Sequence, residues 1–486
     1  MNNADTQFYK KGLELVREVS PEIAASLEGE LESQRTKLKM IASENYCSGA
    51  VRACASSIVM DKYAEGYVDL EKPQGHRYYS GCENVDKIEQ LGMKWACELF
   101  GSEYAYLQPH SGSNANLIAY WAIINAKVME PKIEATCELL DGVGLKEIPD
   151  SMWEDIRHAC GDQDLLAMSL DCGGHLTHGD RTNISSQLFR CYSYGVDPKT
   201  GLVDYDGIRE QALEIRPLIL LAGFSAYPRN LNFKKFREIA DECGAVLMVD
   251  FSHPMGLLAG KVLEGEYNPV PYADIITSTS HKTMRGPRSA FILSKNWLRP
   301  YLEKGCPLVQ GGELPNMVAA KAICFKEAMS PEFQEYAHQV VKNSKALANK
   351  LVSDGIKVIT GGTDNHIILI DVSPLGLTGR QAEQVLEECG IVANRNALPD
   401  DPNGAWYTSG IRLGTPALTT CGMKENEMEL IGGFISKILK NAKPAMTKKG
   451  IPSKAKVYID ESIREEILDK VASLLKRYPP YKEILQ

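Results

Sequence analysis

The sequence of 486 residues lacks several features that mark whole classes of protein. It has no apolar run long enough to cross a bilayer, and its N-terminus has no basic-plus-apolar signal architecture. Internal repeats and low-complexity tracts are also absent. We therefore expect a cytoplasmic protein with no membrane partner.

The chain also has fewer basic than acidic residues, and its cysteines form no metal-binding motif. There are 54 Lys and Arg against 63 Asp and Glu, which gives a formal net charge of -9. Nucleic-acid-binding proteins usually carry a basic surface, so we expect no nucleic-acid partner, although local basic patches remain possible. The thirteen cysteines form no C-x-x-C pair and no zinc-like spacing. This pattern predicts reduced thiols and no metal site.

Short apolar runs alternate with helical stretches between about residues 85 and 325. Such alternation is typical of a mostly parallel sheet covered by helices, so the predicted fold class is α/β. The runs are Asp164–Leu170, Leu218–Gly223, Ala245–Asp250, 275–278 and Ala290–Ser294.

Composition also predicts domain boundaries. We expect an N-terminal arm over 1–60, a large domain over 61–325 and a smaller α+β domain over 326–486. A Ser-Pro pair after the helical stretch 318–329 supports the last boundary. Residues 127–163 are rich in charge and are predicted to be an insertion. Residues 443–458, with five lysines and two prolines, have the composition of a linker and are predicted to be an inserted linker.

Lys282 is the residue that most strongly suggests chemistry. It follows an apolar run and precedes a Gly-Pro turn, which predicts a position just after the C-terminal end of a strand. A lysine there, flanked by hydroxyls and by His281, can form a Schiff base with an aldehyde cofactor such as pyridoxal phosphate. The alternative is a solvated loop lysine.

Other residues could complete such a site. Asp250 ends a predicted strand, where a carboxylate can pair with a pyridinium nitrogen. Ser111 precedes an apolar helix, whose N-terminus can bind a phosphate, although this stretch taken alone favours a plain N-cap. His175 could stack on the ring or be a structural histidine. Arg412 could bind a substrate carboxylate bidentately.

Seven stretches along the chain together resemble serine hydroxymethyltransferase, a fold-type I pyridoxal-phosphate enzyme. They are Ile41–Tyr46, Lys62–Tyr67, Arg77–Glu83, Gln108–Ser113, Gly223–Tyr227, His281–Arg288 and Gly361–His366. The resemblance runs from about Leu38 to Tyr481 and leaves the two predicted additions outside. It implies a large domain with a mostly parallel seven-stranded sheet and a smaller α+β C-terminal domain.

The resemblance also implies a role for each matching residue. The implied catalytic residues are Lys282, Glu65, Asp250, His175, His253 and Thr279. The implied pyridoxal-phosphate ligands are Lys282, Ser111, Gly112, Ser113, His175, Ser225, Asp250, His253, Tyr63, Gly311 and Gly312. The implied amino-acid ligands are Ser43, Glu65, Tyr79 and Arg412. The implied folate ligands are Glu65, Tyr78, Tyr79, Leu170, Gly174, Leu176 and Asn396.

The implied reaction is the reversible conversion of L-serine and tetrahydrofolate into glycine and 5,10-methylenetetrahydrofolate. Glu65 would transfer protons around the serine hydroxyl and the folate. The positions that the family contributes from a neighbouring subunit match Tyr63, Glu65, Tyr78, Tyr79 and the Gly311–Gly312 loop. The resemblance therefore implies a homodimer with shared active sites.

The chain departs from the family pattern in three places. Ser289-Ala290 and Leu308-Val309 stand where glycines are common, and Asp171-Cys172 replaces Ala-His. Side chains in place of glycines restrict the backbone and fill space, so substrate preference and cofactor affinity are the properties that they would change. The alternatives are a folate-independent β-hydroxy amino-acid aldolase or alanine racemase on the same fold, and a non-catalytic scaffold.

Overall fold

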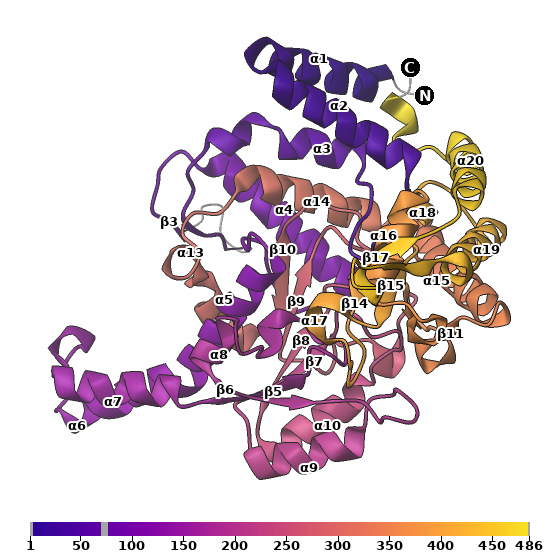
Figure 1. Ribbon diagram of the computed structural model, residues 1–486. Helices are drawn as coiled ribbons and strands as arrows, with labels where there is room; N and C mark the ends of the chain where they lie inside the picture. Colours follow the sequence, from indigo (N-terminus) through magenta and orange to yellow (C-terminus); the bar gives the residue numbers. More distant parts are fainter. Residues whose placement is uncertain (1–2, 70–75, 485–486) are drawn as a thin grey trace. The chain divides into compact units, whose positions relative to one another are not determined.

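The computed structural model describes residues 3–69 and 76–484, and the chain divides into two compact units (Figure 1). The larger unit is Ala50–Ala337, and the smaller unit combines Met1–Gly49 with His338–Gln486. This division differs from the predicted 1–60, 61–325 and 326–486. In the described ranges, no helix is long and apolar enough to cross a membrane.

Strand pairing explains why the first residues group with the last. Strand β1 (Leu38–Lys39) pairs in parallel with β13 (Ile391–Val392). Leu38 and Met40 are fully buried in the hydrophobic core that the C-terminal residues build. The apolar residues at the end of the N-terminal segment therefore belong to the smaller unit.

A seven-stranded sheet organises the larger unit, in the order β4-β10-β9-β8-β7-β5-β6. Neighbouring strands from β6 to β9 in this order are parallel, whereas β10 is antiparallel to both β9 and β4. The predicted mostly parallel α/β fold is confirmed. The strands are β4 (Tyr104–Tyr106), β5 (Asp164–Met168), β6 (Arg190–Tyr194), β7 (Ile219–Gly223), β8 (Val246–Asp250), β9 (Ile275–Thr279) and β10 (Ala290–Ser294).

Burial explains the apolar runs in the sequence. Every residue of β7, β8, β9 and β10 is buried, as expected for strands covered on both faces by helices. Figure 1 shows α9 and α10 packed side by side. The longer helices of this unit are α4 (Glu83–Phe100), α5 (Gly112–Ile124), α6 (Glu130–Leu139), α7 (Asp150–Gly161), α9 (Tyr205–Ile215), α10 (Phe233–Cys243) and α14 (Pro315–Ala328). Its short elements are α3 (Gly49–Ala55), β2 (Gly66–Tyr67), β3 (His76–Arg77), α8 (Ser185–Leu188), α11 (Met255–Ala259), α12 (Arg299–Glu303) and α13 (Gly305–Leu308).

The segment 127–163, predicted to be an insertion, is largely helical. A π-helical turn (Asn125–Met129) continues α5 into α6, and α7 returns toward the sheet. Figure 1 shows α6 and α7 extending away from the sheet of their own unit. The ammonium of Lys127 lies 4.6 Å from the centre of the Trp297 ring, and the hydroxyl of Tyr301 donates to Glu130. These contacts fix the base of the projection.

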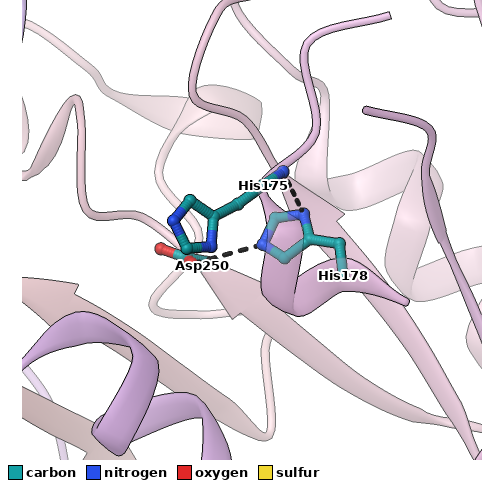
Figure 2. Close-up of side chains that lie close together, drawn as sticks. All are labelled: His175, His178 and Asp250. Carbon is teal, nitrogen blue, oxygen red and sulfur yellow. Dashed lines mark hydrogen bonds and ion pairs between the residues drawn. The ribbon is translucent and has the colours of Figure 1, made fainter. Parts of the chain in front are cut away.

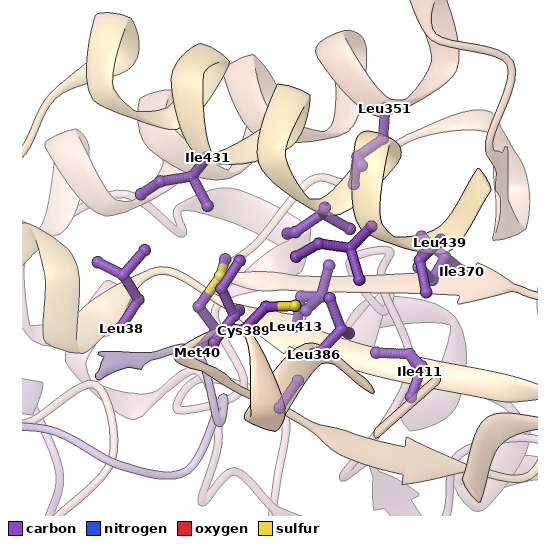
Figure 3. Close-up of a cluster of buried hydrophobic side chains, with 14 of the residues drawn as sticks. Leu38, Met40, Leu351, Ile370, Leu386, Cys389, Ile411, Leu413, Ile431 and Leu439 are labelled. Atoms are coloured by element: carbon purple, nitrogen blue, oxygen red, sulfur yellow. The ribbon is translucent and has the colours of Figure 1, made fainter. Parts of the chain in front are cut away.

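The smaller unit contains a four-stranded antiparallel sheet in the order β11-β12-β15-β14. Its apolar core combines residues from the strands with residues from the surrounding helices (Figure 3). The strands are β11 (Lys357–Val358), β12 (Ile367–Asp371), β14 (Asn394–Asn396) and β15 (Gly410–Gly414). The helices are α1 (Asn3–Val19), α2 (Pro21–Thr36), α16 (Gly379–Glu388), α17 (Gly404–Tyr407), α18 (Pro416–Thr420), α19 (Glu425–Asn441) and α20 (Glu461–Arg477). Helix α15 (Pro331–Ser353) begins in the larger unit and ends in the smaller one.

The prediction of a linker at 443–458 is wrong. Strands β16 (Lys443–Met446) and β17 (Pro452–Tyr458) form an antiparallel hairpin there. The side-chain amide of Gln381 donates to the carbonyls of Ser453 (2.6 Å) and Lys456 (2.9 Å). These hydrogen bonds fasten β17 to the start of α16, and residue composition alone does not reveal them.

Candidate active site

The predicted cofactor residues of the larger unit follow the carboxyl ends of neighbouring parallel strands. Asp250 is the last residue of β8, Ser225 lies two residues after β7, and Lys282 lies three residues after β9. The register aligns Gly223 with Asp250 and Asp250 with Thr277, so these strands end at one edge. Open α/β sheets bind ligands at this edge.

The turn that carries Lys282 is held on several sides. The ammonium of Lys282 donates to Oγ1 of Thr279 (2.9 Å), and that hydroxyl donates to the carbonyl of Ser252 (3.3 Å). The hydroxyl of Thr283 donates to the carbonyl of the buried His253 (2.6 Å). These bonds tie the lysine turn to the segment that follows Asp250.

Arg285 adds a further restraint on the same turn. Its φ of 58° is in the left-handed region, which is uncommon for a residue with a side chain. The guanidinium lies 4.1 Å from the centre of the Tyr336 ring, and the Tyr336 hydroxyl donates to the carbonyl of Thr283 (3.2 Å). This stacking on α15 stabilises the unusual backbone conformation three residues after Lys282.

The carboxylate of Asp250 is buried and accepts three hydrogen bonds. Its Oδ2 accepts from Nδ2 of Asn116 (2.9 Å) and from Nε2 of His178 (3.2 Å), and its Oδ1 accepts from the amide of Ser252 (3.1 Å). Figure 2 shows the imidazole of His178 between the backbone of His175 and the carboxylate. Burial is the largest contribution and opposes ionisation. The hydrogen bonds from His178 and Asn116 and the interaction with the two neighbouring imidazoles together outweigh burial, so the pKa of Asp250 lies below its usual value.

The hydrogen bonds also fix the tautomer of His178. Its Nδ1 accepts the amide N–H of His175 (3.2 Å), so the proton resides on Nε2 and points at Asp250. His175, His178 and Asp250 offer potential metal-ligand atoms within 4.8 Å of one another. A metal ion on Nε2 would move that proton to Nδ1, against the amide N–H. The arrangement therefore suits an ionised carboxylate facing a cationic nitrogen better than a metal ion.

Polar residues extend this network to His175. Thr177 accepts from Nδ2 of Asn116 (2.7 Å), so its own hydroxyl proton points at Nδ1 of His175 (2.7 Å). Nδ1 also accepts the amide N–H of Thr177 (3.2 Å). These two hydrogen bonds to Nδ1 orient the ring of His175.

The predicted phosphate cradle lies at the start of α5. Ser111 is the N-cap, and its hydroxyl accepts the amide N–H of Asn114 (3.3 Å). Ser111 and Ser113 are exposed. A Cβ at Gly112 would lie 2.9 Å from Cγ2 of Thr279, so only glycine fits there without a shift. The helix N-terminus therefore lies beside the strand that leads to Lys282, as an anion site next to a reactive lysine requires.

Ser289 and Ala290, which stand where the family commonly has glycines, are held by hydrogen bonds to neighbouring residues. Ser289 is buried, and its hydroxyl donates to the carbonyl of Pro109 (3.1 Å). The buried ammonium of Lys321 donates to the carbonyls of Leu107 and Ala290. The serine that replaces a glycine thus helps to hold the loop that precedes Ser111.

Residues predicted to serve a neighbouring subunit lie together at the surface. The hydroxyl of Tyr63 donates to Glu65 (3.2 Å), and its ring centre lies 4.6 Å from that of Tyr79. A Cβ at Gly312 would lie 3.5 Å from Tyr63 and 3.7 Å from Glu65. Tyr78 is 73% exposed. The adjacent Gly311, with φ of 73°, has the backbone freedom of a loop glycine.

The predicted folate residues of the larger unit follow β5. Leu170 and Leu176 are 44% and 47% exposed, so both can contact a ligand. Gly174 is enclosed, because a Cβ there would lie 2.1 Å from the carbonyl of Met168. Gly174 therefore shapes the turn that presents His175.

Three predicted residues belong to the smaller unit. Nε of Arg412, on β15, donates to Oδ1 of Asn394 (3.2 Å), and burial lowers the pKa of Arg412 to about 10. The segment with Ser43 packs on the end of β15, because a Cβ at Gly414 would lie 2.4 Å from Cα of Ala42. Asn396 lies on β14, where its amide donates to the carbonyl of Ala397 (2.7 Å).

Sequence reasoning missed Asn116 and His178. Each lies three residues after a residue that was singled out in the sequence, Asn116 after Ser113 and His178 after His175. The available signals were an asparagine at the start of an apolar helix and a second histidine three residues after the first. Their functions depend on hydrogen bonds between elements far apart in the sequence.

The mostly parallel sheet, the lysine after β9 and the buried carboxylate at the end of β8 define a fold-type I pyridoxal-phosphate enzyme. A model of the serine hydroxymethyltransferase family matches residues 16–147 and 159–435. Serine hydroxymethyltransferase of Treponema pallidum is 49% identical over 98% of this chain and 81% of its own. That of Salinispora tropica is 48% identical over 99% of both chains. That of Mycolicibacterium smegmatis is 48% identical over 97% of this chain and 94% of its own.

The chain belongs to the serine hydroxymethyltransferase family. It is accordingly a pyridoxal-phosphate-dependent hydroxymethyltransferase with tetrahydrofolate as cosubstrate. The comparisons give no support to a folate-independent aldolase or racemase as the main activity. The segments 1–15, 148–158 and 436–486 lie outside the match to the family model.

Proposed function

We propose that the residues around Lys282 and Asp250 convert L-serine and tetrahydrofolate reversibly into glycine and 5,10-methylenetetrahydrofolate. The observation that carries the proposal is the chain of hydrogen bonds from Lys282 through Thr279 and Ser252 to Asp250. Bound pyridoxal phosphate supplies an electron sink for the electron pair left on Cα when the Cα–Cβ bond of serine breaks. The protein's contribution is to bind, orient and exchange protons.

Lys282 supplies the amine that holds the cofactor, and Thr279 sets the direction of that amine. Asp250 pairs with the ring nitrogen, and its low pKa keeps it ionised so that the nitrogen keeps a proton. His175 stacks on the ring. Ser111, Gly112 and Ser113 bind the phosphate with hydroxyls and backbone amides, while Ser225 and His253 line the cofactor. These assignments combine the strand-end geometry with the positions that match the family.

Arg412 and Ser43 bind the carboxylate and the polar groups of the amino acid. Burial deprives the Arg412 guanidinium of its interactions with water. A carboxylate bound bidentately would replace these interactions, so burial favours an anionic ligand. Asn396, Leu170, Gly174 and Leu176 contribute to the folate site. Glu65 exchanges protons with the serine hydroxyl and the folate.

We further propose that the enzyme is a cytoplasmic homodimer with shared sites. Tyr63, Glu65, Tyr79 and the Gly311–Gly312 loop lie together in one subunit. Three exposed tyrosines in such a cluster are typical of a surface that meets a partner. In the dimer this cluster, with Tyr78, faces the cofactor and the folate of the neighbouring subunit.

The test is glycine formation from L-serine by the purified, cofactor-loaded protein, with and without tetrahydrofolate. We expect strong dependence on tetrahydrofolate, with 5,10-methylenetetrahydrofolate formed in equal amount. Turnover of L-serine that is indifferent to folate would support the aldolase alternative instead. A protein that binds pyridoxal phosphate without any turnover would contradict the proposal.

A further inference from the structure

The β16–β17 hairpin of the smaller unit carries most of a lysine-rich segment. Residues 431–459 contain seven lysines and no aspartate or glutamate, although the whole chain has a formal charge of -9. The hairpin lysines, all of them exposed, are Lys443, Lys448, Lys449, Lys454 and Lys456. The hairpin is therefore a positively charged surface on a protein whose net charge is negative.

The two faces of the hairpin differ in kind. On β17, Ser453, Ala455 and Val457 are half-buried on the side where Gln381 of α16 binds the backbone. The alternate residues, including Lys454, Lys456 and Tyr458, are exposed. Lys443 pairs directly with Tyr458, so it stands on the same outer face. The lysines are thus presented by a sheet whose other face is anchored.

Acidic side chains do not neutralise this surface. Among residues 3–69 and 76–484, no ion pair involves a lysine of the hairpin. Two acids of the neighbouring α16, Glu383 and Glu387, pair instead with Arg395 and Lys37. The positive charge of the hairpin is therefore available to a partner.

Apolar side chains are exposed among these lysines. Met446 and Ile451, on either side of the turn with Lys448 and Lys449, are 65% and 58% exposed, and Tyr458 is 60% exposed. An alternative explanation for lysines on an edge strand is that they prevent pairing with strands of other molecules. Exposed Met, Ile and Tyr side chains favour association instead of preventing it. Together with the lysines, they indicate a partner that is both anionic and apolar.

We propose that the β16–β17 hairpin binds the surface of an anionic lipid bilayer. Lysines at such a surface are attracted to anionic headgroups, while apolar side chains enter the boundary between headgroups and acyl chains. The aliphatic Met446 and Ile451 at the tip favour lipid over nucleic acid, because bases stack on aromatic rings and guanidinium groups. The enzyme would lie on the membrane without spanning it. This proposal departs from the expectation of no membrane partner, which was drawn from the lack of a membrane-spanning apolar run.

Sedimentation of the full-length, cofactor-loaded enzyme with vesicles tests the proposal. One vesicle is pure phosphatidylcholine, and the other contains equal parts of phosphatidylcholine and phosphatidylglycerol. The variants are K448Q/K449Q, which removes two charges, and M446S/I451S, which removes the apolar tip. The matched control is K234Q/K235Q, which removes two charges from an adjacent and exposed lysine pair on α10. Serine turnover of each variant reports that it is folded.

We expect binding only to the phosphatidylglycerol vesicles, weaker at 0.5 M than at 0.1 M salt. K448Q/K449Q should weaken it about tenfold or more, and M446S/I451S should weaken it at both salt concentrations, with turnover unchanged. K234Q/K235Q should bind like the parent. Equal binding to both vesicles, an equal loss in the control, or binding of a 30-nucleotide RNA without binding of vesicles would overturn the proposal.

Discussion

The imidazole of His178 links the backbone of His175 to the carboxylate of Asp250. Its Nδ1 accepts the amide N–H of His175 and its Nε2 donates to Oδ2 of Asp250, each at 3.2 Å. The backbone turn that presents the proposed stacking histidine is therefore coupled to the proposed partner of the cofactor nitrogen. A change at His178 should disturb both.

Replacing His178 by leucine removes one donor from Asp250. The pKa of Asp250 should rise, because the bond from His178 is the main contribution that lowers it against burial. We expect kcat to fall about tenfold to a hundredfold, since a hydrogen bond to a charged group is worth about 1.5–3 kcal/mol. The acid limb of the kcat profile should move to higher pH. The control is His158→Leu at an exposed position on α7; an unchanged acid limb in His178→Leu would contradict the assignment.

Replacing Lys282 by alanine should abolish turnover and leave the fold intact. The lysine makes its hydrogen bond at a strand end, outside the buried sheet, so its loss removes the amine without opening a cavity. Turnover and the far-UV circular dichroism spectrum measure the two effects. Lys199→Ala, at an exposed turn, is the control. Near-normal turnover of Lys282→Ala would remove its proposed role.

Mixing two inactive variants tests the shared site. If Glu65 serves the neighbouring subunit, a heterodimer of Lys282→Ala and Glu65→Gln contains one complete site. Unfolding and refolding an equal mixture should then restore about a quarter of the parental activity, because half of randomly paired dimers are mixed and each has one working site. Each variant refolded alone is the control. No recovery from a mixture shown to contain mixed dimers would place both residues in one subunit.

Glu313 should make stability depend on pH. One guanidinium, that of Arg77, faces three buried carboxylates: Asp86 at 2.8 Å, Glu89 at 2.6 Å and Glu313 at 3.6 Å. Burial, with a smaller contribution from Glu89, raises the pKa of Glu313 from 4.5 to about 7. Between these values the folded protein holds a proton that the unfolded chain releases. The contribution to the free energy of unfolding is therefore present below pH 4.5 and is lost as the pH rises through 7.

Glu313→Gln removes this titration. We expect the variant to be more stable than the parent at pH 8 by about 1–3 kcal/mol, with a smaller difference at pH 5.5. Urea unfolding of the cofactor-loaded protein at the two pH values measures this. Glu138→Gln, at an exposed position on α6, is the control. A difference that is the same at both pH values would show that Glu313 does not titrate in this range.

Ser289 should stabilise the loop before the phosphate cradle. Ser289→Ala removes only its hydrogen bond to Pro109 and should cost about 1 kcal/mol. Ser289→Gly also adds backbone freedom in the unfolded chain and should cost about 1–2 kcal/mol. Urea unfolding gives these values, and the rate of cofactor loss on dilution should rise in both variants. Greater stability of the glycine variant would show that the serine is strained.

Much of the larger unit could be predicted from the sequence, because its central strands are buried on both faces. β7, β8 and β10 begin and end within one residue of the predicted runs. β6 (Arg190–Tyr194) was not predicted, since this edge strand is largely exposed and its sequence has no apolar run. β4 is only three residues long, too short for a pattern.

The residues of the candidate site also divide into those that could be predicted from the sequence and those that could not. Lys282 and Asp250 could be predicted because each follows a recognisable strand. Asn116 and His178 could not, since their partners lie 134 and 72 residues away in the sequence. The β16–β17 hairpin was mistaken for a linker because the side chains that hold it belong to α16. Properties set by neighbours along the chain were predictable, and those set by distant partners were not.

The reversed direction of β10 has a consequence for how Lys282 moves. Parallel strands need a long crossover between them, whereas antiparallel neighbours need only a short connection. Because β10 is antiparallel to β9, residues 280–289 suffice, and Arg285 and Thr283 clamp that connection. The amine therefore travels only as far as its own four-carbon stem can swing. In its proposed role, Lys282 would therefore reposition its amine by rotation about the bonds of its own side chain, because the connection on which it lies is held in place.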